Sequence, residues 1–150
     1  MATDGSRPAT PDDVDAICAS LPDTELGTSW GDVPTWKVPV GPKGKGFVLY
    51  RPPGKTAIDH TTGEPYDDLL VILTPTEAEK RALVEDPATP FITIDHFNGY
   101  NAVLVQRARL GEISRDELRE IINDAWTVRA PKRLVEDHLG PGFGLGSGEG

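Results

Sequence analysis

The segment from Val33 to Thr56 concentrates positive charge in a chain whose formal net charge is -9. It contains no acidic residue, and its basic residues are Lys37, Lys43, Lys45, Arg51 and Lys55. Lysine and arginine neutralise phosphates, and such contacts supply most of the nonspecific affinity of proteins for DNA. The segment therefore indicates binding to the phosphates of a nucleic acid. The alternative is that the lysines only keep an exposed hairpin edge soluble.

Two of these lysines, Lys43 and Lys45, flank Gly44 in the sequence GPKGKG. The sequence joins two predicted strands, so we expect a glycine-rich hairpin tip. Glycine lets the backbone approach a phosphate closely, and lysine binds phosphate without reading the bases. The tip is thus a candidate wing for weak, salt-sensitive binding to duplex DNA.

A second basic pair, Lys132-Arg133, follows Pro131 at the predicted start of a short final helix. Cations at the N-terminus of a helix oppose its macrodipole, which favours a nearby anion. The anion is either an external partner such as DNA or an internal carboxylate, for which Glu120 and Asp124 are the candidates.

The aromatic residues indicate an alternative function, the binding of a small molecule. A pocket between the sheet and the helices, lined by Trp30, Trp36, Tyr100 and Trp126, would bind or sequester a small aromatic, drug-like ligand. Trp36 follows an apolar pattern in a predicted strand, which also favours a role as a core anchor.

The sequence contains no complete catalytic or metal-binding motif. Gly54-Lys55-Thr56 matches the end of a phosphate-binding loop, but Leu49 stands where that motif needs glycine. Each histidine follows an aspartate, yet neighbouring side chains on a strand point to opposite faces. Cys18 is the single cysteine, which rules out an internal disulfide. We therefore expect a non-enzymatic binding module without cofactor or metal.

The elements that position these residues begin with three predicted helices. Thr10, Thr74 and Ser114 are each followed three residues later by a carboxylate, which is the pattern of a capping box. Apolar residues at helical spacing follow the first and the third cap: Val14, Ile17, Cys18 and Leu21 in one case, Leu118, Ile121, Ile122, Ala125 and Trp126 in the other.

Strand patterns cover residues 35–40, 46–51, 67–74, 90–95 and 101–109. Strands in succession with short links predict an α+β domain. We expect an antiparallel sheet of about five strands, with helices packed mainly on one face, in a single domain over residues 10–139. Residues 1–9 are expected to be disordered, and residues 140–150, with glycine at every second position, to form a flexible tail.

These pieces resemble the MmcQ/YjbR family, in particular its actinobacterial branch. The resemblance rests on Trp36-Lys37-Val38 after Gly31, on Ala125-Trp126, and on the run from Ala130 to Leu134. It implies a compact α+β fold of the double-wing or CyaY-like type. Members of the family are commonly labelled DNA-binding by structural analogy, and no catalytic motif comes with that label.

Composition limits the cellular setting. The sequence contains no apolar run of the roughly 18 residues that a membrane span needs and no apolar leader near its start. We expect a cytoplasmic monomer that does not bind membranes. The 24 acidic residues against 15 basic ones count against DNA binding over the surface as a whole, so any such contact has to be local.

Overall fold

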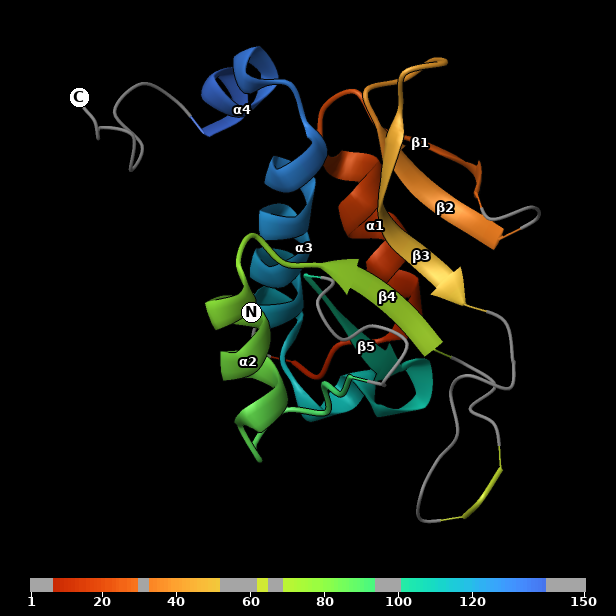
Figure 1. Cartoon of the computed structure of the whole chain (residues 1–150), viewed down its shortest axis with the longest axis vertical. Coiled ribbons are helices and arrows are strands. Elements are labelled where there is room, and N and C mark those ends of the chain that lie inside the picture. Colours follow the sequence, from red (N-terminus) through yellow and green to blue (C-terminus); the bar gives the residue numbers. More distant parts are fainter. Residues whose placement is uncertain (1–6, 30–32, 52–61, 65–68, 94–100, 140–150) are drawn as a thin grey trace.

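A computed structural model of the chain describes residues 7–29, 33–51, 62–64, 69–93 and 101–139 (Figure 1). These residues form an α+β domain around one five-stranded antiparallel sheet. The strands are β1 (Glu25–Ser29), β2 (Val33–Val38), β3 (Lys45–Arg51), β4 (Leu69–Leu73) and β5 (Ala102–Gln106). The predicted fold class is confirmed.

The strands lie in the sheet in the order in which they occur in the sequence. All five residues of β4, an interior strand between β3 and β5, are buried, because apolar side chains occupy both of its faces. The β2–β3 hairpin closes where Val38 pairs with Lys45. The GPKGKG segment therefore forms a hairpin tip, as predicted.

The strands predicted from the sequence differ from the observed sheet in three places. The first strand, β1, was not predicted, since ELGTS contains one large apolar residue and resembles a loop in sequence. In the region predicted as a strand over 90–95, Ile92 instead makes an isolated bridge to Leu104, while residues 94 and 95 lie outside the described residues. The strand predicted over 101–109 ends at Gln106, and a 3-10 helix (Arg107–Glu112) follows it.

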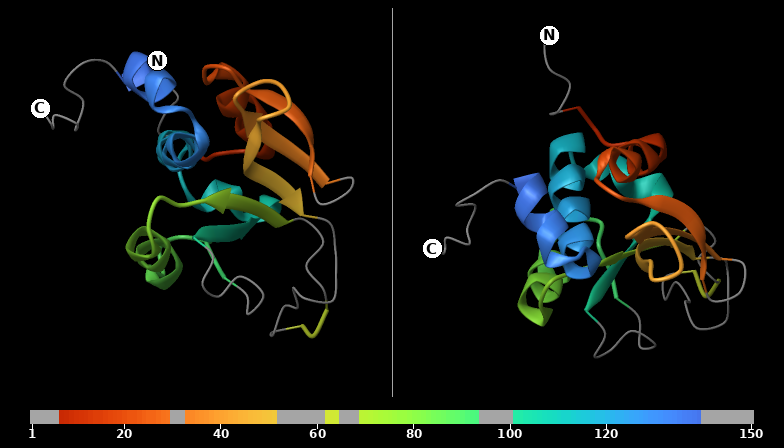
Figure 2. Two further views of the ribbon diagram at one scale, coloured as in Figure 1. Left: turned by 45° about the horizontal axis from the view of Figure 1, so that its top comes forward. Right: turned by 90° about the horizontal axis from the view of Figure 1, so that it is seen from above.

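The helices are α1 (Pro11–Ser20), α2 (Glu77–Glu85), α3 (Arg115–Arg129) and α4 (Lys132–Leu139). Helices α1 and α3 pack against each other and lie on the same face of the sheet, while α2 contacts β5 (Figure 2). Helix α4 follows α3 after a short break and lies at the end of the molecule that also carries the β2–β3 tip (Figures 1 and 2).

Capping boxes at Thr10 and Ser114 start α1 and α3, as the sequence predicts. The predicted cap at Thr74 is wrong, because α2 starts after Thr76, whose hydroxyl accepts a hydrogen bond from the Glu79 amide. Proline disfavours helical backbone in the residue before it. Thr74, which precedes Pro75, instead continues the pairing of β4 with β5 and donates its amide to the Asn101 carbonyl at 2.9 Å.

The core lies between α1, α3 and the sheet. The apolar faces predicted for both helices are inward, and Trp126, Leu118 and Ile122 are fully buried. The Trp126 indole N–H donates to the Pro22 carbonyl at 3.1 Å, so its one polar atom is satisfied in the interior.

The folded part of the chain starts before Thr10. Arg7 forms an ion pair with Asp13 at 2.7 Å, and Ala9 is buried and donates its amide to the Ile113 carbonyl. Residues 7–9 therefore belong to the domain, although we expected disorder through residue 9. The predicted glycine-rich tail over 140–150 lies outside the described residues.

Candidate nucleic-acid interface

The tip of the β2–β3 hairpin is a β-turn that presents Lys43. The Gly44 amide donates to the Gly41 carbonyl at 3.0 Å, which places Pro42 and Lys43 at the two central positions. Proline is favoured at the first of these, because its ring fixes the backbone angle that the turn needs. The side chains of Lys43 and Lys45 are exposed.

One hydrogen bond and one glycine hold this turn in its conformation. The Glu25 carboxylate on β1 accepts a hydrogen bond from the Gly41 amide at 2.9 Å. At Gly44, a Cβ atom would lie 2.5 Å from the Pro39 carbonyl oxygen, a distance that no side chain tolerates. Glycine at this position thus allows the backbone to fold closely over itself and hold Lys43 at the corner.

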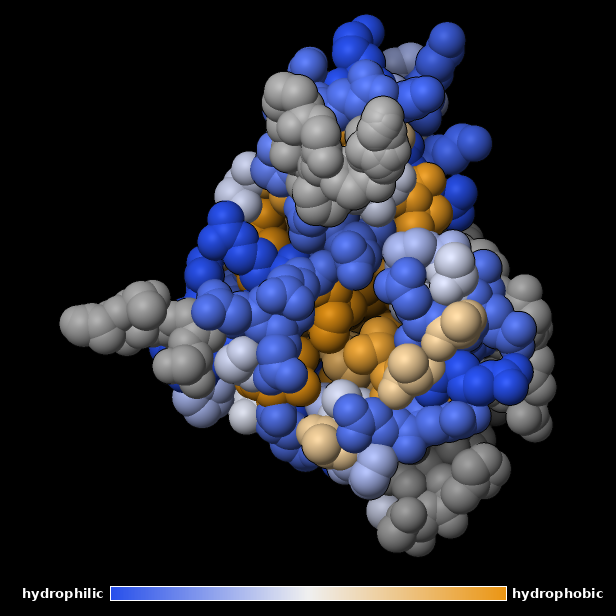
Figure 3. Space-filling view, turned by 90° about the vertical axis from the view of Figure 1, so that its left-hand side faces the viewer, coloured by the Kyte–Doolittle hydropathy of each residue, from blue (hydrophilic) through white to orange (hydrophobic). Residues whose placement is uncertain are grey.

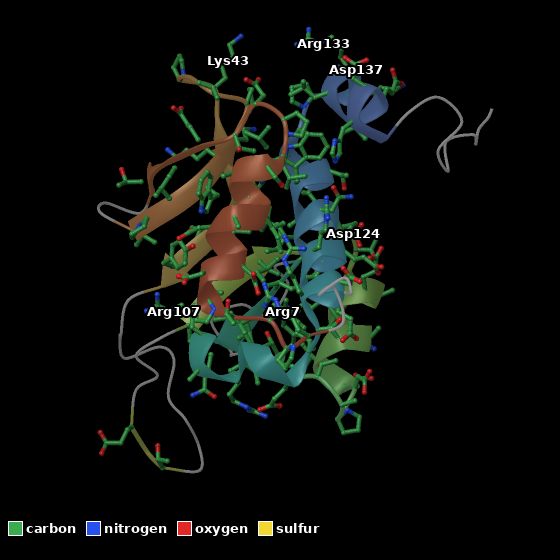
Figure 4. The ribbon with its side chains drawn as sticks, turned by 180° about the vertical axis from the view of Figure 1, so that it is seen from behind. Arg7, Lys43, Arg107, Asp124, Arg133 and Asp137 are labelled. Atoms are coloured by element: carbon green, nitrogen blue, oxygen red, sulfur yellow. The ribbon has the colours of Figure 1, made fainter. Side chains whose placement is uncertain are left out.

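The second basic pair lies at the same end of the molecule. Lys132 and Arg133 are exposed at the start of α4, and Arg133 and Lys43 both project from this end (Figure 4). Neither Lys132 nor Arg133 forms an ion pair or a side-chain hydrogen bond with another described residue. The internal pairing with Glu120 or Asp124, which the sequence left open, is therefore not formed.

Arg129 connects these two groups. It is the last residue of α3, and its Nε donates to the Gly46 carbonyl at the start of β3 at 3.3 Å. The bond ties the corner between α3 and α4 to the base of the hairpin. We call Lys43, Lys45, Arg129, Lys132 and Arg133 the basic end. Glu136 and Asp137 follow on α4 and reduce its positive potential.

The other basic residues of the Val33–Thr56 segment do not join the basic end as a group. Lys37 is half-buried, and a methyl group at Gly27 would lie 3.6 Å from its Cδ and Cε atoms, so its stem lies along β1. Arg51 ends β3 about 20 Å from Lys45, at roughly 3.3 Å per residue; its side chain is outside the described set, as is Lys55.

The structure describes two of the four residues proposed to line an aromatic pocket, and both are buried in the core. Trp126 is enclosed in the core, and Trp36 is 8% exposed. Trp30 and Tyr100 lie outside the described residues. The two tryptophans that the structure places thus serve packing, and both indole N–H groups are used by protein acceptors.

A polar cluster instead surrounds Asp15 on α1. One carboxylate oxygen of Asp15 accepts hydrogen bonds from the Trp36 indole at 2.9 Å and from the Tyr50 hydroxyl. Burial and the hydrogen bond to Asp15 raise the pKa of Tyr50 above its ordinary value. The Arg107 guanidinium lies 5.8 Å from the centre of the Tyr50 ring, within range of a cation–π contact. The cluster ties α1 to β2 and β3.

Groups suited to catalysis or metal binding are not gathered elsewhere in the described residues. Burial raises the pKa of the Cys18 thiol, which keeps it protonated and unreactive. Within the residues the structure places, no group of three or more histidine, cysteine or acidic side chains is arranged to hold a metal ion. Among the same residues, no helix has the length and apolar character to cross a membrane.

With this geometry in place, comparison with known proteins assigns the family. The model of the YjbR family matches residues 19–128, which is most of the chain. This chain belongs to the YjbR family. The matched region begins inside α1 and ends inside α3, so it contains the whole sheet and the hairpin of the basic end, while α4 follows it.

Three mycobacterial proteins are similar to this chain over most of its length. Uncharacterized proteins of Mycobacterium bovis (Mb2600) and Mycobacterium tuberculosis (Rv2570 and MT2646) are 34% identical to it over 136 residues, which covers 87% of this chain and 96% of each relative. The crystal structure of Deinococcus radiodurans protein DR2400, with a DUF419 domain, matches with a TM-score of 0.57 at 16% identity, over 97% of this chain and 90% of that one. That likeness shows the fold.

Two residues of the candidate interface could not be identified from the sequence. Glu25 was missed because β1 was not predicted, and Arg129 because a helix end does not reveal which strand it will contact. The spacing of Arg129 from Lys132 and Arg133 was a usable signal, since all three lie within five residues of one helix–helix corner.

Proposed function

We propose that this YjbR-family protein is a non-enzymatic binding module that contacts the phosphates of duplex DNA through its basic end. The observation that carries the proposal is the convergence of two exposed basic pairs from distant parts of the sequence. Lys43 and Lys45 come from the hairpin tip and Lys132 and Arg133 from α4, at one end of the molecule (Figure 4).

The lack of internal ion pairs at these four side chains, among the residues that the structure describes, supports binding to an external anion. Lys43, Lys45, Lys132 and Arg133 form no ion pair with another described residue, so they are available without breaking an internal contact. By comparison, Arg81 and Arg109 on other surfaces are paired with glutamates at 2.9 Å and 2.7 Å. A phosphate backbone presents negative charges at regular spacing, which a cluster of separate cations matches.

The shape of the basic end supports a backbone contact more than a reading of bases. The β-turn presents Lys43 at a corner, and Arg129 fixes the hairpin against α3. Lysines that bind phosphates position a protein without selecting sequence. We therefore expect modest affinity, little sequence preference and a strong dependence on salt, because the rest of the acidic molecule repels DNA.

The test is a titration of a fluorescently labelled DNA duplex at several salt concentrations, followed by anisotropy. About five phosphate contacts give a slope of about -4 to -5 in log K against log salt. Neutralising Lys43 and Lys45 with glutamine should flatten the slope by about two, and so should neutralising Lys132 and Arg133.

The matched control removes two cations from elsewhere. Arg107 lies away from the basic end (Figure 4). Arg119 is an exposed residue of α3. The Arg107→Gln/Arg119→Gln variant has the same net charge as each test variant and should bind DNA like the wild type. The proposal fails if the wild type shows no binding at about 50 mM salt, where phosphate contacts are strong, or if all three variants lose affinity equally.

A further inference from the structure

A second surface of the molecule, formed by α2 and α3, is apolar and acidic, whereas the basic end is positively charged. Figure 3 shows hydrophobic side chains in a hollow on this face, bordered by hydrophilic ones. Leu83 and Val84 on α2 and Ile121 on α3 are half-buried and pack onto the core from this side. We call these three side chains the floor of the α2–α3 groove. They leave apolar surface in contact with water.

Three carboxylates border this groove. Glu120 and Asp124 lie one turn apart on α3, and Glu79 on α2 is close enough to act on Asp124 through its charge. Burial of part of its side chain, and then the charges of Glu79 and Glu120, raise the pKa of Asp124. A carboxylate that has like charges as neighbours is stabilised by a cation placed among them.

These carboxylates have no cation of their own in the described residues. On the same helix α2, Glu77 and Glu85 both pair with Arg81, at 2.9 Å and 3.9 Å. By contrast, Glu79, Glu120 and Asp124 form no ion pair with another described residue. Since α2 satisfies the glutamates on its outer side, the unpaired acidic rim is a feature of the groove and not of the helix as a whole.

We propose that the α2–α3 groove binds a basic amphipathic helix of a partner protein. An apolar stripe of such a helix would cover Leu83, Val84 and Ile121, and its lysines or arginines would pair with the three rim carboxylates. A groove with an apolar floor and charged rim is a common way to bind a helix, with apolar anchors at positions i, i+3 or i+4, and i+7.

The charge of the rim discriminates among other occupants. Phosphates of DNA or of a lipid surface would be repelled by the three carboxylates, so this site is separate from the basic end. A bound metal ion does not fit, because these side chains are not among any described group arranged to hold one. A second copy of this chain is also disfavoured as the occupant, since two molecules with a net charge of -9 repel each other.

The probe is a fluorescein-labelled helical peptide of about 18 residues, in which leucines form one stripe and lysines occupy the other positions. Binding to the full chain is followed by anisotropy. Two comparison peptides are used. One has the same composition in scrambled order, and the other has glutamate in place of each lysine. We expect saturable binding of the first peptide, at least about tenfold tighter than of either comparison peptide.

Two groove variants locate the site. Glu79→Gln/Glu120→Gln/Asp124→Asn should weaken binding about tenfold or more, because three cation contacts are lost. Ile121→Asp, which leaves the rim intact and places a charge in the apolar floor, should also weaken it. The matched control, Glu64→Gln/Glu136→Gln/Asp137→Asn, removes three exposed carboxylates elsewhere and should bind the peptide like the wild type. Circular dichroism of each variant checks that it is folded.

Several outcomes would overturn the proposal. Equal binding of the ordered and scrambled peptides would show charge attraction without a groove. Equal losses in the groove and control triple variants would show the same. A concentration-dependent dimer that Ile121→Asp dissociates would assign the groove to a second copy of the chain, and no binding of the ordered peptide would remove the site. DNA affinity should not fall in the groove triple variant, because every cation of the basic end remains, and this separates the result from the basic end.

Discussion

The indole N–H of Trp36 on β2 donates a hydrogen bond of 2.9 Å to the carboxylate of Asp15 on α1, 21 residues earlier in the sequence. The same oxygen accepts the Tyr50 hydroxyl from β3. One exposed carboxylate thus joins a helix to two strands. Its second oxygen makes no hydrogen bond with a described residue, so solvation of that oxygen limits the cost of holding the charge there.

Removing this carboxylate should destabilise the fold. Asp15→Ala leaves the Trp36 and Tyr50 donors without their acceptor, and we expect a loss of about 1–2 kcal/mol in the free energy of unfolding. Urea unfolding measures the loss. Asp12→Ala, at an exposed position of the same helix, should cost less. A double-mutant cycle of Asp15→Ala with Tyr50→Phe should show coupling, and additive effects would contradict the shared hydrogen bond.

Trp126 should be among the most sensitive core positions. It is fully buried, contacts the His138 ring at a centroid distance of 5.0 Å, and bonds to the Pro22 carbonyl. Trp126→Ala should lower the free energy of unfolding by about 3–5 kcal/mol, because a large cavity remains. Val128→Ala on the same helix, where the side chain is 39% exposed, serves as the control and should cost about 0.5 kcal/mol or less.

Stability should fall at acid pH through Asp13. The hydrogen bond from Arg7 is the largest cause that lowers the pKa of Asp13 from 3.8 to about 2. A folded pKa below the unfolded value means that the contribution, about 2 kcal/mol, is complete above pH 4 or so and disappears as the pH falls through about 2. Asp13→Asn should reduce the slope of stability between about pH 4 and 2. An unchanged slope would contradict the Arg7 contact.

The hairpin tip should depend on Gly44 independently of its charge. In Gly44→Ala the new methyl group would lie 2.5 Å from the Pro39 carbonyl, so the turn has to open. We expect a loss of about 1–3 kcal/mol in stability and weaker DNA binding, although Lys43 and Lys45 remain. In the wild type the Gly44 amide donates to the Gly41 carbonyl, so amide hydrogen exchange at position 44 of the variant reports the opening directly. Normal exchange with normal DNA affinity would contradict the role of the turn.

Much of the framework was predictable because it depends on short-range patterns. Thr10 and Ser114 start helices through a carboxylate three residues away, and the apolar spacing in α3 places Trp126 inward. The failures depend on competition. Thr74 has the same local pattern as Thr10, but its amide bonds to Asn101 in the sheet, and a second hydroxyl at Thr76 is available to start the helix.

The candidate sites were predictable in part. Lys43 and Lys45 follow from a turn sequence, whereas their location at the same end of the molecule as Lys132 and Arg133 depends on how α3 crosses the sheet. The approach of Glu79 to Asp124 likewise joins two helices that are 30 residues or more apart, and no local pattern encodes it. Tertiary proximity of exposed charges carries no periodic signal, because solvent accepts a charged side chain at almost any surface position.

The order of strands in the sheet has a consequence for how fast the chain folds. Every strand pairs with its neighbour in sequence, from β1 through β5. Folding rates fall as the mean sequence separation of contacts rises, because distant segments must meet before they gain stability. This sheet can grow by adding one hairpin at a time, and the entropy of closing the longest link, between β4 and β5, rises only with the logarithm of its length. We therefore expect the domain to refold faster than sandwiches of similar size whose strands pair out of order.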